Sequence, residues 1–223
     1  LEGHPAASGD PSPVTAEGVF RGMQLSVRRA LGRDLDGVGV AIQGVGHVGA
    51  NLAQKLAAAG AKLTLADVNA EAAAEVASRT GAKVVPPGGI FDVEAEVFAP
   101  CALGGAVSAE TLPRLRCKVI AGGANNQLAD ALVGAEVFAR GMLYAPDYVI
   151  NGGGIINVAG EIRAIDAGGA FDPAWVEGKL ARLIGTLEEV MDRSVREGRP
   201  THEVADELAR ARLAVAAENK AAA

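Results

Sequence analysis

The stretch over residues 38–67 constrains the fold most, because it reads as a strand, a glycine-rich turn, a helix and a second strand in succession. An apolar run over residues 38–43 predicts a buried strand, and a second apolar run over residues 62–66 leads to Asp67. An alanine-rich segment of helical character lies between them and ends at Gly60. The turn that opens this helix carries glycines at the spacing G-x-G-x-x-G, namely Gly44, Gly46 and Gly49. This combination predicts a βαβ unit of the kind that binds dinucleotides.

In such a turn the first glycine allows the tight bend, the second lets a pyrophosphate approach the backbone, and the third lets the helix pack closely on the strand. The helix N-terminus presents free N–H groups and the positive end of its dipole to the phosphates. Asp67 lies about 20 residues beyond the motif, where a carboxylate accepts hydrogen bonds from ribose hydroxyls and repels a 2′-phosphate. The sequence therefore predicts NAD rather than NADP as the cofactor. The cofactor-binding residues predicted in this unit are Gly44, Val45, Gly46, His47, Val48, Gly49, Asp67 and Val68.

Two other interpretations of the glycine turn remain open. A glycine-rich corner between a strand and a helix can exist without any ligand. A methyltransferase carries similar glycines, but an acidic residue is expected beside the first of them, and Gln43 stands there instead. The surrounding strands, helix and aspartate favour the dinucleotide interpretation over both. Within the turn, the side chain of His47 is expected to point outward.

Composition limits the classes of function further. The chain has 223 residues, a formal net charge of −6 and no block of basic residues, which argues against nucleic acid as a partner. No stretch is long and apolar enough to predict a membrane span, and the polar, Pro/Gly-rich start does not resemble a signal peptide. Cys101 and Cys117 lack the spacing of metal ligands, so no metal site is predicted, and both are expected to be reduced thiols in a cytoplasmic protein.

Strands and helices continue to alternate along the rest of the chain. Further strands are expected over residues 82–85, 96–99, 117–121 and 142–145, and helices over residues 13–31, 69–79 and 129–140. Ser12 and Asn69 are expected to cap two of these helices, and Ser108 to begin a short one. This alternation predicts an α/β fold, a doubly wound parallel sheet of Rossmann type.

The final part of the chain has a different pattern. Residues 146–154 read as a loop rich in Gly and Asn, and the apolar spacing is helical from Ile155 onward, with a last helix from Thr201. We therefore expect a helical C-terminal segment, whose apolar stripe suits the core or a contact between copies in a homo-oligomer. The expected organisation is a hinge and first helix over residues 1–34, an NAD-binding domain over residues 35–160 and C-terminal helices over residues 161–223.

Asparagines gather in the loops that follow the later strands. Asn125, Asn126, Asn151 and Asn157 all lie in or just after such loops. In an open parallel sheet the ligand lies outside the carboxyl ends of the strands. Uncharged amides there suit a carboxamide, a ribose or a substrate carboxylate, although any single asparagine can equally be a turn residue.

Several stretches taken together resemble the cofactor-binding domain of the glutamate/leucine/phenylalanine/valine dehydrogenase family, and its leucine dehydrogenase branch most. The stretches that carry this resemblance are residues 8–16, 43–49, 99–105, 124–128 and 144–158. The similarity extends from about residue 8 to about residue 213. Several of these motifs are more specific to the family than the glycine turn is.

The resemblance implies NAD-dependent oxidative deamination of an L-amino acid to a 2-oxo acid and ammonia. It places Thr15 near the nicotinamide carboxamide, and Ala102 and Asn125 beside the nicotinamide ribose, with Cys101 and Leu103 also at the cofactor. The resemblance further places the substrate beside three residues: Asn126 near its carboxylate, and Ile155 and Val158 around its side chain. The aliphatic branches of the last two favour leucine, valine or isoleucine over phenylalanine or glutamate.

One departure from the family is large. The family's catalytic lysines and acidic residue lie in a substrate domain before the hinge, and this sequence begins at the hinge with Leu1 rather than Met. We therefore assign no catalytic residue, and expect this chain to be the cofactor-binding half of a dehydrogenase, cut or trimmed from a longer chain and inactive alone. The alternative is a non-catalytic NAD-binding module or sensor.

Overall fold

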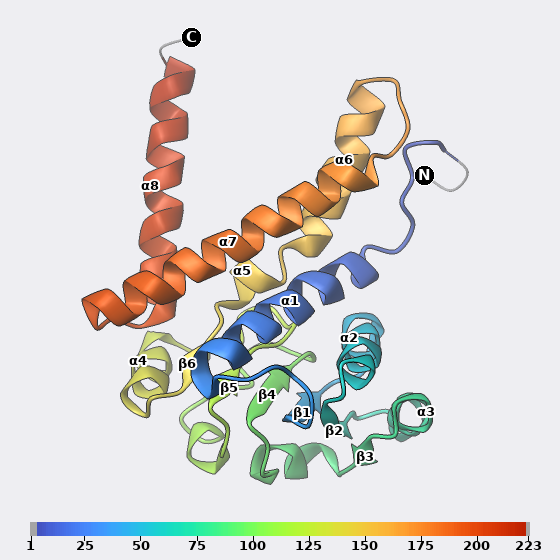
Figure 1. Ribbon diagram of the computed structural model, residues 1–223, viewed down its shortest axis with the longest axis vertical. Coiled ribbons are helices and arrows are strands. Elements are labelled where there is room, and N and C mark those ends of the chain that lie inside the picture. The colour runs from blue at the N-terminus through green and yellow to red at the C-terminus, as the bar shows by residue number, and fades with distance from the viewer. Residues whose placement is uncertain (1–3, 222–223) are drawn as a thin grey trace.

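A six-stranded parallel sheet lies at the centre of the computed structural model, which describes residues 4–221 (Figure 1). The strands are β1 Gly39–Gln43, β2 Lys62–Ala66, β3 Lys83–Val84, β4 Val97–Pro100, β5 Val119–Ile120 and β6 Leu143–Tyr144. Their order across the sheet is β3-β2-β1-β4-β5-β6. This is the order of the Rossmann-type doubly wound fold, in which the chain changes direction between β1 and β4. The predicted fold class is therefore confirmed, and the predicted strands are all present.

Helices connect the strands and then form the C-terminal part of the chain. They are α1 Ser12–Leu31, α2 His47–Ala58, α3 Ala70–Thr80, α4 Ala131–Ala139, α5 Asp147–Ile150, α6 Gly153–Asp166, α7 Pro173–Glu197 and α8 Thr201–Ala221. Short 3-10 helices lie at Pro87–Asp92 and Leu112–Arg114. None of the helices in the described part of the chain combines the length and the apolar character that crossing a membrane requires.

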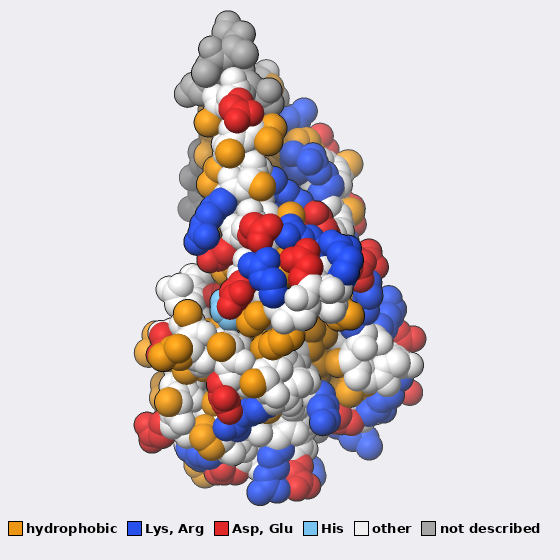
Figure 2. Space-filling model, turned by 90° about the vertical axis from the view of Figure 1, so that its left-hand side faces the viewer, with side chains coloured by type: hydrophobic (Ala, Val, Ile, Leu, Met, Phe, Trp, Pro, Cys, Tyr) orange, Lys and Arg blue, Asp and Glu red, His pale blue; other side chains and the backbone are white. Residues whose placement is uncertain are grey.

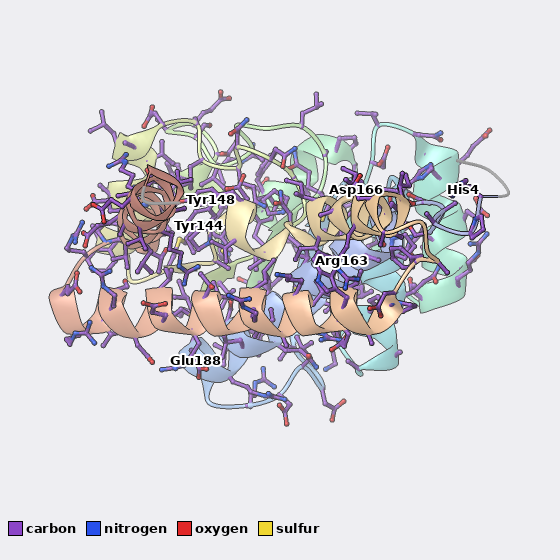
Figure 3. The ribbon with its side chains drawn as sticks, turned by 90° about the horizontal axis from the view of Figure 1, so that it is seen from above. His4, Tyr144, Tyr148, Arg163, Asp166 and Glu188 are labelled. Atoms are coloured by element: carbon purple, nitrogen blue, oxygen red, sulfur yellow. The ribbon has the colours of Figure 1, made fainter. Side chains whose placement is uncertain are left out.

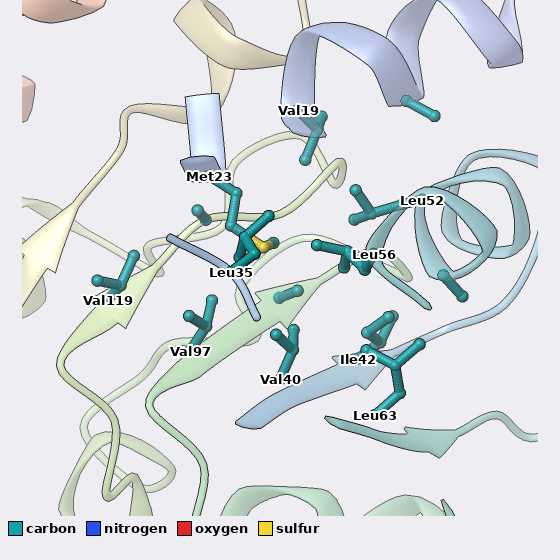
Figure 4. Close-up of a cluster of buried hydrophobic side chains, with 14 of the residues drawn as sticks. Val19, Met23, Leu35, Val40, Ile42, Leu52, Leu56, Leu63, Val97 and Val119 are labelled. Atoms are coloured by element: carbon teal, nitrogen blue, oxygen red, sulfur yellow. The ribbon is translucent and has the colours of Figure 1, made fainter. Parts of the chain in front are cut away.

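Each face of the sheet buries its own apolar cluster, because successive residues of a strand point to opposite faces. On β1, Val40 and Ile42 pack under α1 and α2, whereas Ala41 points to the other face. The first cluster includes Val19, Met23, Leu52, Leu56, Val97 and Val119 (Figure 4). The second cluster contains Phe98, Ile120, Leu112, Val133 and Val137. The central strands are thus buried on both sides, as is typical of a parallel sheet, whereas the edge strand β3 is exposed.

The C-terminal helices extend the molecule away from the sheet. Helix α7 runs across α1 and α6. Helix α8 begins near the C-terminal end of α7 and extends away from the sheet (Figures 1 and 3). Gly198, with φ of 63°, ends α7 in the left-handed conformation that glycine favours. A cluster of alternating charges covers the corner between α7 and α8 (Figure 2), and includes Arg193, Glu197, Arg199 and Glu207. The helical C-terminal segment is therefore confirmed.

Local signals placed most helix ends correctly. Asn69 caps α3, because its side-chain oxygen accepts hydrogen bonds from the N–H groups of Glu71 and Ala72, both at 3.1 Å. The prediction that Ser12 caps α1 was wrong by one residue. Pro11 occupies the N-cap position, and the Ser12 N–H donates instead to Asp10 Oδ1 at 2.9 Å. Helix α1 therefore begins without a side-chain cap.

Two further expectations need correction. Ser108 does not start a helix, because its N–H donates to Thr111 Oγ1 in a turn, and the 3-10 helix begins only at Leu112. Residues 146–154 are not a continuous loop, since they contain α5 and the start of α6. Ile150 of α5 is fully buried against α1, where a Cβ added at Gly22 would come within 2.5 Å of the Ile150 side chain. The short helix α5 is stabilised by this packing, and the local sequence contains no signal that predicts it.

Candidate functional site

The glycine turn between β1 and α2 has three different environments at its three glycines. Gly44 has φ of 93°, a conformation that other residues rarely adopt. A Cβ added at Gly49 would come within 2.1 Å of the Gly44 carbonyl oxygen, so only glycine lets α2 pack this closely on the turn. A Cβ added at Gly46 would meet no atom within 4 Å. The backbone at Gly46 therefore faces open space, where a ligand can approach it.

The start of α2 is open to an anion. Gly46 is its N-cap residue and has no side chain, so no side-chain oxygen satisfies the N–H groups of the first turn. The first turn contains no acidic residue either. Unpaired N–H groups and the positive end of the helix dipole together make this position suited to a phosphate.

Asp67, which directly follows β2, binds the backbone of the glycine turn through its carboxylate. Its Oδ2 accepts a hydrogen bond from the Val45 N–H at 2.7 Å, and its Oδ1 accepts one from the Asn69 N–H at 2.8 Å. A carboxylate has about four lone-pair positions, so two stay available for further donors. The carboxylate is thus fixed beside the glycine turn with acceptor capacity remaining for a diol.

A cavity of about 530 Å³ lies beside the glycine turn, at the carboxyl side of the sheet. It is bounded by the beginnings of α1 and α2, the loop after β5 and one side of α6. The side chains and backbone that line it come from Pro11, Thr15, Val48, Gly123, Asn125, Asn151, Gly154, Ile155, Val158, Ala159 and Ile162. The α6 side is aliphatic, with Ile155 80% exposed and Val158 42% exposed. The lining is therefore apolar along the helix and polar along the opposite loops.

The polar side of the cavity is held together by amides. Asn151 Nδ2 donates to Asn125 Oδ1 at 2.7 Å, which joins the end of α5 to the loop after β5. A Cβ added at Gly123 would come within 2.6 Å of Val48 Cγ1, so the loop after β5 packs directly on the first turn of α2. The Gly123 N–H donates to Cys101 Sγ at 3.3 Å. The loops after β4 and β5 and the end of α5 are thus connected to one another.

Five of the residues predicted for the site line this cavity together: Thr15, Val48, Asn125, Ile155 and Val158. Others lie nearby without lining it. Ala102 packs against Gly44, since a Cβ added to that glycine would come within 2.8 Å of Ala102 Cβ. Burial raises the pKa of the Cys101 thiol to about 11, so this group is a neutral packing residue of the turn. Asn126 is exposed and has φ of 52°.

Three predicted positions are strongly exposed and do not line the cavity. The side chains of Val68 and Leu103 are 93% and 85% exposed, and neither lines the cavity. His47 points outward as expected, with its side chain 82% exposed and its Nδ1 3.3 Å from Asp10 Oδ2. The pKa of the Asp10 carboxyl is below its ordinary value, mainly because the carboxylate accepts a hydrogen bond from the Ser12 N–H. His47 lowers this pKa further.

Several residues that line the cavity were not predicted from the sequence. Ile162 lies on the same side of α6 as Ile155 and Val158, at the spacing of four and three residues that a helix gives. That spacing is a signal that could have identified it. Ala159 has the same helical spacing relative to Ile155 and Ile162, whereas Pro11 carries no comparable signal, because it reaches the cavity only through the packing of α1 on α6. Among the described residues, no group of His, Cys, Asp and Glu has the arrangement of a metal site.

The fold and this site define a doubly wound domain of the nucleotide-binding class, with its cavity at the switch point of the sheet. A family model described as glutamate/leucine/phenylalanine/valine dehydrogenase matches residues 64–221. The chain belongs to this family, as the resemblance in its sequence indicated.

Known relatives match nearly the whole chain. Leucine dehydrogenase from Bacillus cereus is 44% identical over 209 residues, which are 93% of this chain and 56% of that protein. Valine dehydrogenase from Streptomyces albus is 38% identical over 220 residues, 94% of this chain and 57% of that protein. The crystal structure of L-tryptophan dehydrogenase from Nostoc punctiforme superposes with a TM-score of 0.87 at 37% identity, and covers 95% of this chain and 63% of that one. The chain thus spans a little over half the length of the curated relatives it matches.

Proposed function

We propose that this chain is the cofactor-binding part of an NAD-dependent dehydrogenase that deaminates a branched-chain L-amino acid to a 2-oxo acid and ammonia. The observation that carries the proposal is the position of the cavity. The aliphatic side of α6, Asn125 of the loop after β5 and Asn151 at the end of α5 line one cavity, which also includes Val48 of the uncapped first turn of α2. Asp67 binds the Val45 N–H of the glycine turn that leads into this helix. A hydride transfer needs a flat cofactor and a small substrate to meet in one such cavity.

The residues around the glycine turn fit NAD. The pyrophosphate would lie over Gly46, at the start of α2, and the adenine ribose would donate its hydroxyls to Asp67. Thr15 and Asn125 would contact the nicotinamide end of the cofactor, since both line the cavity. When bound, NAD supplies the acceptor for the hydride of the substrate α-carbon. A 2′-phosphate would face the Asp67 carboxylate, and the proposal is therefore NAD rather than NADP.

The aliphatic wall supports a branched-chain substrate. Ile155, Val158 and Ile162 offer an apolar surface without a charge, whereas a glutamate side chain would need a positive partner. The substrate carboxylate would lie toward Asn126. The known activities of the relatives, on leucine, valine and tryptophan, are consistent with an apolar side chain.

A second candidate is a non-catalytic NAD-binding module, and one observation favours it. No lysine lines the cavity in the described part of the chain, so the chain offers no amine there to serve as a general base.

We propose that the lysines of the reaction lie in a substrate domain outside residues 1–223, and that the enzyme is a homo-oligomer. Residues 1–223 alone would then bind NAD without turning over an amino acid.

An assay of NADH formation separates the two candidates. It uses the full-length protein, in which residues 1–223 are joined to the proposed substrate domain, with NAD and with L-leucine, L-valine, L-phenylalanine, L-tryptophan or L-glutamate in turn. The proposal predicts turnover of leucine and valine, with glutamate at least about a hundredfold slower because its charge has no partner in an apolar pocket. NAD binding without turnover of any amino acid would favour the non-catalytic module. Faster turnover of glutamate than of leucine would contradict the proposed substrate class.

A further inference from the structure

Gln127 is a fully buried polar residue in the loop after β5, over residues 121–127. This loop carries Asn125, which lines the cavity, and Asn126, whose positive φ needs a defined environment. Gln127 itself does not line the cavity. Burying an amide costs free energy unless hydrogen bonds replace water, so its place in the interior requires an explanation.

The Gln127 amide donates both of its hydrogens to the loop that contains it. Nε2 donates to the Gly122 carbonyl at 2.7 Å and to the Ala124 carbonyl at 3.0 Å. Its Oε1 is buried and has no protein partner. The amide orientation follows from this arrangement, because a flipped amide would direct an oxygen at both carbonyls. A glutamine is thus suited to the position as a double donor, which neither a carboxylate nor an apolar side chain can be.

Other contacts fix Gln127 from outside the loop. Its backbone N–H donates to Asp147 Oδ2 at 3.4 Å, and its carbonyl accepts from the Val107 N–H at 2.9 Å. Asp147 is buried too, and its Oδ1 accepts from the Tyr144 hydroxyl at 2.9 Å. Tyr144 lies near Tyr148 at the base of α8 (Figure 3). The backbone of Gln127 is therefore held in place by residues outside the loop, while its side-chain amide binds two carbonyls within the loop.

We propose that Gln127 is a positioning residue, which sets the location of Asn125 at the cavity by holding the carbonyls on either side of Gly123. This inference rests on the proposed function, because it assigns Asn125 to the nicotinamide end of NAD. The Gly122 and Ala124 carbonyls precede Asn125 by three and one residues, so their positions determine where the Asn125 backbone leaves the loop. The Asn151–Asn125 hydrogen bond then completes the orientation of the side chain.

A graded series of substitutions tests this role in the full chain. Wild type donates two hydrogen bonds, a neutral Gln127→Glu side chain donates one, and Gln127→Met donates none at nearly the same volume. We expect the Kd for NAD to rise in that order, about tenfold for Gln127→Met. Ser26→Ala serves as the control, because it removes a buried hydrogen bond to the Gly22 carbonyl on α1. The control should leave the Kd for NAD unchanged.

A double-mutant cycle separates positioning from general stability. In the Asn125→Ala background, Gln127→Met should change the Kd less than about twofold, since the residue through which Gln127 acts is gone. An equal loss in both backgrounds, or a wild-type Kd in Gln127→Met, would overturn the inference and leave the proposed function intact. If Gln127→Met does not fold, the same comparison is made with Gln127→Glu.

Hydrogen exchange provides a readout that does not need the cofactor. Exchange of the backbone amides over residues 121–127 should accelerate in Gln127→Met and stay as in wild type in Ser26→Ala. If wild type binds no NAD, the proposed function fails, and this exchange alone decides the role of Gln127. Unchanged exchange in that loop would then overturn it.

Discussion

The three glycines of the turn share a motif but have different physical reasons to be glycine. Gly44 needs a positive φ, and Gly49 needs to lack a Cβ because the Gly44 carbonyl is so close. Gly46 has an ordinary φ of −63° and free space at its Cβ position. No steric contact within the fold therefore requires glycine at this position, whereas a ligand that approaches the backbone there does.

Alanine substitution at two of these glycines should have opposite signatures. Gly46→Ala should lower the free energy of unfolding by at most about 1 kcal/mol, because alanine is a poorer N-cap residue than glycine but its methyl group meets no atom here. It should raise the Kd for NAD at least about tenfold, because the new methyl group occupies the approach to the backbone. Gly49→Ala should cost about 1–3 kcal/mol of stability through overpacking. Urea unfolding and calorimetric titration measure both quantities.

An unchanged Kd in Gly46→Ala would contradict the placement of the pyrophosphate.

At the residue scale the sequence was informative where a residue acts on the backbone of its own short segment, as at Gly44, which needs a positive φ, and at Asn69, which caps α3. It was uninformative about Asn151 as the partner of Asn125, because that hydrogen bond joins residues that are 26 positions apart. Ile155 could be predicted as a site residue only through the resemblance to a family, whereas Asn125 was also a candidate from its place in a loop that follows a strand.

At the scale of elements, helix ends with local signals were predictable and helices formed by packing were not. Helix α3 begins after Asn69 and ends at Gly81, which are residue types that favour an N-cap and a C-cap position respectively. Helix α5 has only four residues, and no isolated segment of that length is helical in water. It exists because Ile150 is buried against α1, at a place where Gly18 and Gly22 leave room.

The corner between α7 and α8 is an element-scale feature whose stability should depend on pH. Glu207 on α8 accepts hydrogen bonds from Arg199 and Arg193, which lower its pKa from 4.5 to about 2. Because the folded pKa is depressed, its contribution is present above pH 4.5 and is lost as the pH falls toward 2. Glu207→Gln should therefore lower Tm at pH 7 and leave it nearly unchanged near pH 2.

Thermal unfolding across this pH range provides the check, with Glu110→Gln as an exposed control outside the charged cluster. The difference in Tm between wild type and Glu207→Gln should narrow as the pH falls. The Tm of Glu110→Gln should follow that of wild type throughout. A difference for Glu207→Gln that stays constant from pH 7 to pH 2 would show that the ion pairs to Arg193 and Arg199 do not stabilise the corner.

At the scale of the whole molecule, the sheet topology brings the site together. The cavity combines the start of α1, the start of α2, loops after two strands and one side of α6, which are distant in the sequence. The alternation of strands and helices predicted this convergence, since the carboxyl ends of parallel strands share one edge. It did not predict that α7 would cross α1 and α6, because that depends on which apolar faces pack together. The division into residues 1–34, 35–160 and 161–223 stays a prediction.

The central claim is that the glycine turn and Asp67 form an NAD site. Calorimetric titration of this chain with NAD and with NADP tests it most directly. NAD should bind, and NADP should bind at least about tenfold more weakly, because its 2′-phosphate would face the Asp67 carboxylate. Equal affinities would contradict the role of Asp67, and no binding of either nucleotide would contradict the claim itself.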